Sequence, residues 1–106
     1  MRVALIQNKP GNDKTDNLKE VLNLIPKTEF DLLVLPELFN SPYGINYFKY
    51  YAENIDLGGE TITFLKNLSL NNPNSYIIGG SFPEEKDGKY YNTCTVWNNG
   101  NIITIY

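Results

Sequence analysis

Histidine is absent from this chain of 106 residues, and cysteine occurs once, at Cys94. Without histidine the chain cannot supply a Ser-His-Asp or Cys-His catalytic group, nor a histidine ligand for zinc. One cysteine cannot form a disulfide within the chain, which is typical of a reducing compartment. We therefore expect a cytoplasmic location, with a mitochondrial one left open, and we expect no cofactor and no metal.

Basic residues and long apolar runs are also scarce. Nine Lys and Arg residues against twelve Asp and Glu residues give a formal net charge of -3, and no basic patch stands out. We therefore expect no nucleic-acid partner, since such partners bind basic surfaces. The apolar runs are only a few residues long, so we also expect no membrane association. The 42% hydrophobic fraction is enough for the core of one small unit over residues 1–106.

The beginning of the chain is patterned as strand, helix and strand. Arg2–Gln7 and Leu32–Leu35 are short apolar segments typical of buried strands. Between them, apolar residues recur at the spacing of one helical face: Leu18, Val21, Leu22 and Ile25. Thr15 or Asp16 is the predicted cap of this helix, and Pro26 ends it because proline cannot continue the hydrogen-bond ladder. This order predicts two parallel strands joined by a crossover helix.

A second amphipathic helix and a third strand follow. Thr61 is the predicted cap of the helix, which runs through Asn71, and Tyr76–Ile78 is the strand. Two glycines, Gly79 and Gly80, come directly after this strand. Glycines at a strand end indicate a bend or a close approach of two backbones.

The last part of the chain predicts antiparallel structure. Pro83–Lys89 is a charged loop, and Tyr90–Trp97 and Asn101–Tyr106 are strands joined at Asn98–Gly100, where Asn-Gly is a strong hairpin signal. The fold class is therefore α/β with an antiparallel ending. No predicted helix covers the last strand, so we expect the domain to be incomplete in this chain.

An aromatic-rich segment, Tyr43–Asn54, is predicted to contain a short helix. Tyr47, Phe48 and Tyr51 lie at i, i+1 and i+4. We expect these rings to pack on the sheet, because aromatic side chains most often contribute buried area. The alternative is that some of them line the mouth of a pocket.

The most informative stretch is Asp31–Gly44, DLLVLPELFNSPYG. It places one carboxylate, Glu37, directly after a buried strand and a proline, at the start of a turn-rich loop. Ligands and catalytic groups of α/β sheets lie at the carboxyl ends of strands. We expect Glu37 to be partly desolvated, which favours proton uptake, and we predict a general acid–base role. The alternative is a solvated acid that caps the next turn.

Other groups carry weaker chemical signals. Cys94 can be a nucleophile, but we expect a small buried residue within a strand, since no histidine is present to activate it. The segment Gly79–Ser81 matches no phosphate-binding fingerprint, so we assign it to strand-end geometry. Glu84, Glu85 and Asp87 form a short acidic run, for which solvation is a simpler explanation than a metal site.

Four stretches together resemble the amino-terminal part of a nitrilase-superfamily carbon–nitrogen hydrolase. They are RVALIQ, LVLPELF, IIGGSFPE and YNTCTVWNNGNIITIY. The segments FNSPYG, YAENI and IGGSFPEE are most similar to the omega-amidase, or Nit2-like, branch. The resemblance covers nearly all 106 residues. It implies an α-β-β-α sandwich that pairs across subunits, so we expect a homo-oligomer, most simply a dimer.

The resemblance also implies a Glu–Lys–Cys triad that hydrolyses small amides, with Glu37 as the general base. In the family the lysine follows the strand that here ends at Tyr106, and the nucleophilic cysteine lies further on. Cys94 belongs to a different strand, so only the glutamate has a counterpart here, and we expect this chain alone to be inactive. The resemblance to omega-amidases implies that the substrates are short dicarboxylic monoamides such as α-ketoglutaramate. Phe39 and Tyr43, in the loop of Glu37, are the local residues predicted to bind substrate.

Two hypotheses from different functional classes follow. In the first hypothesis the chain is part of an omega-amidase-like enzyme, as a truncated gene model, a cleaved product or half of a split chain. In the second hypothesis it is a non-catalytic assembly module that pairs with a full-length homologue. In the first case a second chain can supply the missing part. A metal-dependent nuclease or phosphatase also places a glutamate at a strand end, but it needs partner acids and a histidine, and this chain has no histidine.

Overall fold

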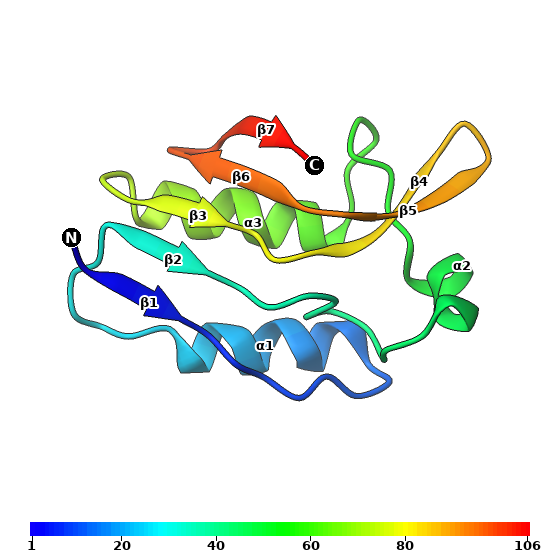
Figure 1. The fold of residues 1–106 in the computed structure, drawn as a ribbon, viewed down its shortest axis with the longest axis horizontal. Helices are drawn as coiled ribbons and strands as arrows, with labels where there is room; N and C mark the ends of the chain where they lie inside the picture. Colours follow the sequence, from blue (N-terminus) through cyan, green and yellow to red (C-terminus); the bar gives the residue numbers. More distant parts are fainter.

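The computed structural model describes all 106 residues, and its main sheet has five strands (Figure 1). The strand order is β1-β2-β3-β6-β7, with the first three strands parallel and the last two antiparallel. The strands are β1 (Val3–Leu5), β2 (Leu32–Val34), β3 (Tyr76–Ile78), β6 (Thr95–Asn98) and β7 (Asn101–Ile105). The predicted α/β class, the parallel start and the antiparallel ending are therefore confirmed.

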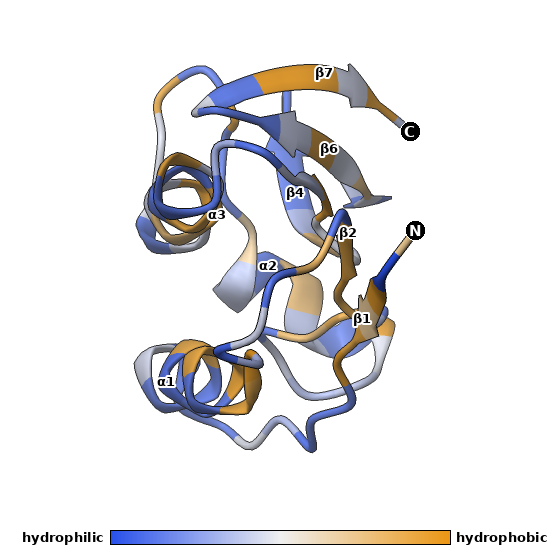
Figure 2. Ribbon diagram, turned by 90° about the vertical axis from the view of Figure 1, so that its left-hand side faces the viewer, coloured by the Kyte–Doolittle hydropathy of each residue, from blue (hydrophilic) through white to orange (hydrophobic).

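Two helices cover one face of this sheet, α1 (Lys14–Leu24) and α3 (Glu60–Asn71). Figure 2 shows both on the same side, as expected when successive right-handed crossovers step across the sheet in one direction. The core lies between the layers, where Val21, Leu33 and Leu65 have no exposed surface. Neither helix is long and apolar enough to cross a membrane.

The other face of the sheet carries no covering layer. Side chains of paired residues share a face of a sheet, and Val3 pairs through Leu32 with Tyr76. Val3, Leu5 and Tyr76 are 49%, 74% and 52% exposed on this face. The main sheet and its two helices therefore form one sheet layer and one helix layer, which is half of the four-layer sandwich that we expected.

The segment predicted as the loop Pro83–Lys89 is instead half of a hairpin. Strands β4 (Phe82–Lys86) and β5 (Lys89–Thr93) form a separate two-stranded sheet. The acidic pattern misled the prediction, because the carboxylate of Glu84 is buried and accepts a 2.6 Å hydrogen bond from the Thr93 hydroxyl. The predicted strand Tyr90–Trp97 is accordingly divided at Cys94, where the chain passes from this hairpin to the main sheet.

The aromatic segment forms a 3-10 turn, η1 (Ile45–Tyr47), and a single helical turn, α2 (Phe48–Tyr51). The prediction that its rings pack on the sheet is wrong: Tyr47 is 41% exposed and Tyr50 is 80% exposed. The reason is their location, since α2 lies beside the β4–β5 hairpin and not over the sheet (Figure 1). Tyr47, Tyr50 and Tyr51 instead border an open hollow, as the alternative prediction stated.

Both long helices begin differently from the prediction. Helix α1 is capped by Asp13, whose side chain accepts a hydrogen bond from the backbone N–H of Asp16. Helix α3 starts after Gly59, and the backbone N–H groups of Thr61 and Ile62 donate to the carboxylate of Glu53. The cap of α3 is therefore supplied by a residue outside the helix, which the local sequence pattern does not reveal.

Candidate functional site

Glu37 lies just past the carboxyl end of β2, in the centre of the parallel part of the sheet. Leu35 continues the pairing with β3 through a 2.9 Å hydrogen bond from its N–H to the carbonyl of Ile78, and Pro36 then ends the ladder. The side chain of Glu37 is exposed. The expected desolvation of this carboxylate is therefore wrong, because the two side chains that contact it, Tyr43 and Asn92, are themselves exposed and leave it open to solvent.

The turn after Glu37 is held in a strained conformation. Leu38 has φ of 49°, in the left-handed region that bulky residues rarely occupy. Its N–H donates to the hydroxyl oxygen of Ser81 at 3.0 Å, and the N–H of Ser81 donates to the carbonyl of Pro36 at 3.3 Å. Strain of this kind persists only where surrounding contacts maintain it. Ser81 therefore determines the direction in which the chain presents Glu37.

Gly80 makes this arrangement sterically possible. Its φ is +55°, and a Cβ atom at this position would overlap the carbonyl oxygen of Pro36. The prediction that Gly79 and Gly80 mark strand-end geometry is confirmed, and the geometry is a close approach between the chain after β3 and the chain after β2.

Both oxygen atoms of the Glu37 carboxylate accept hydrogen bonds. The carboxamide of Asn92, on β5, donates to Oε1 at 2.8 Å, and the hydroxyl of Tyr43 donates to Oε2 at 3.1 Å. Glu37 raises the pKa of Tyr43, first through the hydrogen bond and then through the negative charge of the carboxylate. The site is thus a single carboxylate held by two neutral donors.

The two residues predicted to bind substrate lie in different environments. Tyr43 is 73% exposed and contacts Glu37, so it stands at the site. Phe39 has no exposed surface and packs in the core, with its ring centroid 6.4 Å from that of Phe64. The Phe39 ring does not reach the surface beside Glu37, so it has no place in the site that the structure describes.

Cys94 borders the same open hollow as Glu37, which has a volume of about 360 Å³ and is lined also by Ile78, Ser81 and Asn92. The thiol is half-buried at the junction of β5 and β6, and not within a strand as we predicted. Burial raises the pKa of the Cys94 thiol. Since the thiolate is the nucleophilic form, this environment is unfavourable for a nucleophile.

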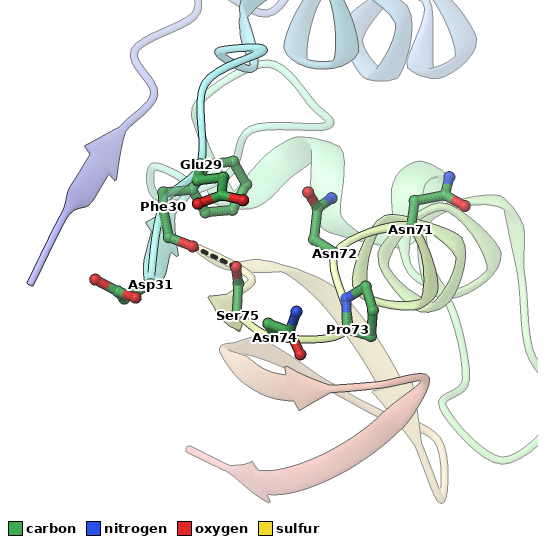
Figure 3. Close-up of a pocket in the computed structure, with 8 residues that line it drawn as sticks. All are labelled: Glu29, Phe30, Asp31, Asn71, Asn72, Pro73, Asn74 and Ser75. Atoms are coloured by element: carbon green, nitrogen blue, oxygen red, sulfur yellow. Dashed lines mark hydrogen bonds between the residues drawn. The ribbon is translucent and has the colours of Figure 1, made fainter.

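A second, more polar hollow of about 250 Å³ lies at the opposite end of the parallel strands. Figure 3 shows it between the chain before β2 and the chain before β3, where the Ser75 hydroxyl donates to the carbonyl of Phe30. It is bordered by Glu29 and Asp31 and by three asparagines. Glu37 is at the other end of β2, so this hollow is not part of the site.

The sequence interpretation missed two residues of the site, Ser81 and Asn92. Both lie in stretches that carry the family resemblance, so the stretches themselves were the available signal. Their roles depend on contacts with a segment 43 residues away for Ser81 and 55 residues away for Asn92. Local patterns do not encode such pairings.

Comparison with known proteins assigns the family. The family model of carbon-nitrogen hydrolase matches residues 2–106. The chain belongs to the carbon–nitrogen hydrolase family. Omega-amidase NIT2 of Mus musculus is 44% identical over 99 residues, covering 91% of this chain and 35% of that protein. A hydrolase of Schizosaccharomyces pombe is 39% identical over 110 residues, covering 99% of this chain and 34% of that protein.

Solved structures agree with this assignment. Nit3 of Saccharomyces cerevisiae, a member of branch 10 of the nitrilase superfamily, superposes with a TM-score of 0.88 at 33% identity, over 100% of this chain and 43% of that one. An N-terminal amidase superposes with a TM-score of 0.82 at 26% identity, over 99% of this chain and 27% of that one. The nitrilase-like fold and the resemblance to the nitrilase superfamily are therefore confirmed. This carbon–nitrogen hydrolase chain spans about a third of the length of the curated relatives that it matches.

Proposed function

We propose that the protein works in amide hydrolysis of the omega-amidase type, with Glu37 as the general base. The observation that supports this proposal is the placement of the Glu37 carboxylate, at the carboxyl end of a central strand and beside an open hollow. The neutral donors Asn92 and Tyr43 orient the carboxylate without cancelling its charge. A base needs both properties, since it must point at the proton and retain the charge that attracts it.

In the proposed reaction, Glu37 accepts the thiol proton of a cysteine that lies outside residues 1–106. The resulting thiolate attacks the amide carbonyl, and a lysine, also outside this chain, stabilises the negative oxygen of the tetrahedral intermediate. Glu37 returns the proton to the departing nitrogen, and ammonia leaves a thioester. Water then attacks the thioester while Glu37 accepts one of its protons, which releases the acid and restores the thiol.

We propose short dicarboxylic monoamides such as α-ketoglutaramate as the substrate class. Similarity to omega-amidase NIT2 proteins supports this choice. Within this chain, Tyr43 is the residue proposed to contact the substrate, because its hydroxyl lies 3.1 Å from Glu37 Oε2 and its side chain is exposed.

The open face of the sheet supports a proposal about assembly. Val3, Leu5 and Tyr76 expose apolar surface where a second layer can bury it. We propose that further residues of the domain pack on this face, supplied by the same polypeptide or by a second chain, and that the complete domain forms a homodimer. Native mass spectrometry of this chain with a full-length homologue tests the assembly hypothesis, which is contradicted if only monomers are seen at micromolar concentration.

The function is tested by ammonia release from α-ketoglutaramate, using the natural protein that carries this chain. Glu37→Gln keeps the shape of the side chain and one oxygen that can accept from Asn92, but it replaces the second oxygen with an NH2 group and removes the base, so we expect a loss of about 10²- to 10⁴-fold in kcat. Glu29→Gln, an exposed acid at the opposite end of β2, is the matched control and keeps the rate. Full activity of Glu37→Gln overturns the proposal. Residues 1–106 alone are expected to release no ammonia.

A further inference from the structure

We infer that Asn92 is the positioning residue of the general base: its carboxamide holds Oε1 of Glu37 and leaves Oε2 as the oxygen that takes the proton. This inference rests on the proposed function. Asn92 Nδ2 lies 2.8 Å from Oε1, whereas the Tyr43 hydroxyl lies 3.1 Å from Oε2. The shorter contact comes from a strand and the longer one from an exposed loop, so the two oxygens are held unequally.

Asn92 lies in a hairpin that is held to the rest of the chain by backbone hydrogen bonds. Asn92 is the partner of Pro83 in the β4–β5 hairpin. The hairpin is in turn joined to the chain after α2, because the N–H of Glu53 donates to the carbonyl of Pro83 and the N–H of Glu85 donates to the carbonyl of Glu53, both at 3.0 Å. The carboxamide therefore approaches Glu37 from a braced element.

The chemical character of asparagine suits this role. A carboxamide donates a hydrogen bond but carries no charge, so it orients a carboxylate without neutralising it. A lysine at this position would neutralise the carboxylate, and an aspartate would repel it. Asn92 is itself exposed, so packing does not account for the contact.

This exposure makes the inference testable by substitution, since surface changes rarely unfold a protein. Asn92→Ala removes the donor, and Asn92→Asp keeps the shape but replaces the donor with a negatively charged acceptor. Asn101→Asp is the matched control, because Asn101 is an exposed asparagine on a strand whose carboxamide contacts only the carbonyl of Asn99. Thermal unfolding of each variant shows that the fold is retained.

Enzyme kinetics of the Asn92 variants, measured in the natural protein that carries this chain, distinguish a role in positioning Glu37 from a role in packing. We expect kcat for a small amide to fall about tenfold in Asn92→Ala and about 100-fold in Asn92→Asp, with little change in KM. The order is diagnostic, since a side chain needed only for its shape would tolerate the isosteric Asp better than Ala. Higher activity in Asn92→Asp than in Asn92→Ala overturns the inference, as does an equal loss in Asn101→Asp.

A measurement on the chain itself separates this inference from the proposed function. The side-chain amide signals of Asn92 in a ¹H–¹⁵N spectrum are expected to move when Glu37 is changed to Gln, since the amide then faces a neutral group. Unmoved signals overturn the inference alone. Moved signals together with full activity of Glu37→Gln overturn the proposed function, and the contact is then only structural.

Discussion

Lys14 and Glu53 form the one ion pair in the structure, with 2.9 Å between Nζ and Oε2. The side chains are only 19% and 5% exposed. Glu53 also accepts hydrogen bonds from the backbone N–H groups of Thr61 and Ile62 at the start of α3. One carboxylate thus joins the first residue of α1 to the first turn of α3, and it lies where the dipole of α3 favours a negative charge.

Removing this carboxylate is expected to destabilise the chain strongly. Glu53→Ala removes the ion-pair partner of Lys14, whose ammonium keeps only its hydrogen bond to the carbonyl of Tyr51, and it leaves two helix N–H groups without an acceptor. We expect a loss of about 3 kcal/mol in the free energy of unfolding. Urea denaturation measures the loss. Glu60→Ala is the control: it removes an exposed acid from the same helix end together with its solvent-exposed hydrogen bond from the Thr15 hydroxyl, and it should change the free energy far less. An equal loss of unfolding free energy in Glu53→Ala and Glu60→Ala would show that the buried hydrogen bonds and ion pair of Glu53 do not account for the loss.

The close approach at Gly80 predicts a large effect of adding one methyl group. Gly80→Ala places a Cβ against the Pro36 carbonyl at a positive φ, so either the turn that carries Glu37 moves or the chain loses about 3 kcal/mol of stability. Gly58→Ala isolates the cost of positive φ, because Gly58 has φ of +86° and no atom within 4 Å of the added Cβ. We expect that variant to lose about 1 kcal/mol. Similar denaturation midpoints for the two variants would contradict the argument.

The contact between Tyr43 and Glu37 predicts a titration. The pKa of Tyr43 is raised above 10.0, and Glu37→Gln should lower it toward that ordinary value by removing the negative charge. NMR titration of the ring measures this, with Tyr43→Phe assigning the signal. Because the folded pKa is raised, the stabilising contact is fully present below the unfolded pKa and is lost as the pH rises through the folded one. A Tyr43 pKa that is unchanged in Glu37→Gln would refute the contact.

The half-buried position of the Cys94 thiol predicts that it is alkylated slowly. Burial raises the pKa of Cys94, so less thiolate is present at neutral pH than in an exposed cysteine. Alkylation by iodoacetamide, followed by mass spectrometry, should therefore be slower in the native chain than in urea, and the native rate should rise only at higher pH. Native alkylation as fast as that in urea would instead mark Cys94 as an accessible, reactive thiol.

Elements with a local signal were predictable from the sequence. The apolar spacing in α1 and α3 and the short apolar strands follow from the periods of helices and strands. The turn at Asn99 and Gly100 also has a local cause, since both residues adopt positive φ, as a tight hairpin requires, and Asn-Gly tolerates this. Glu37 was identified because a strand, a proline and a carboxylate are adjacent in the chain.

Features that depend on distant partners were not predictable in this way. The acidic run at Glu84 was interpreted as a loop because the pattern does not reveal that Thr93 hydrogen-bonds to the buried carboxylate. The aromatic turn at Tyr47 was expected in the core because composition does not reveal that it lies beyond the end of the sheet. Phe39 was placed in the site because it is near Glu37 in sequence, although its side chain turns into the core.

The sequence by itself determined the α/β class, the family and the position of the carboxylate, because these depend on periodicity and on contiguous motifs. Only the tertiary structure decided that Glu37 is exposed, that Ser81 holds the strained turn after it and that Asn92 orients its carboxylate. The physical reason is separation along the chain. Hydrogen bonds across 43 and 55 residues exist only after the strands have paired, and no local pattern specifies which donors and acceptors then meet.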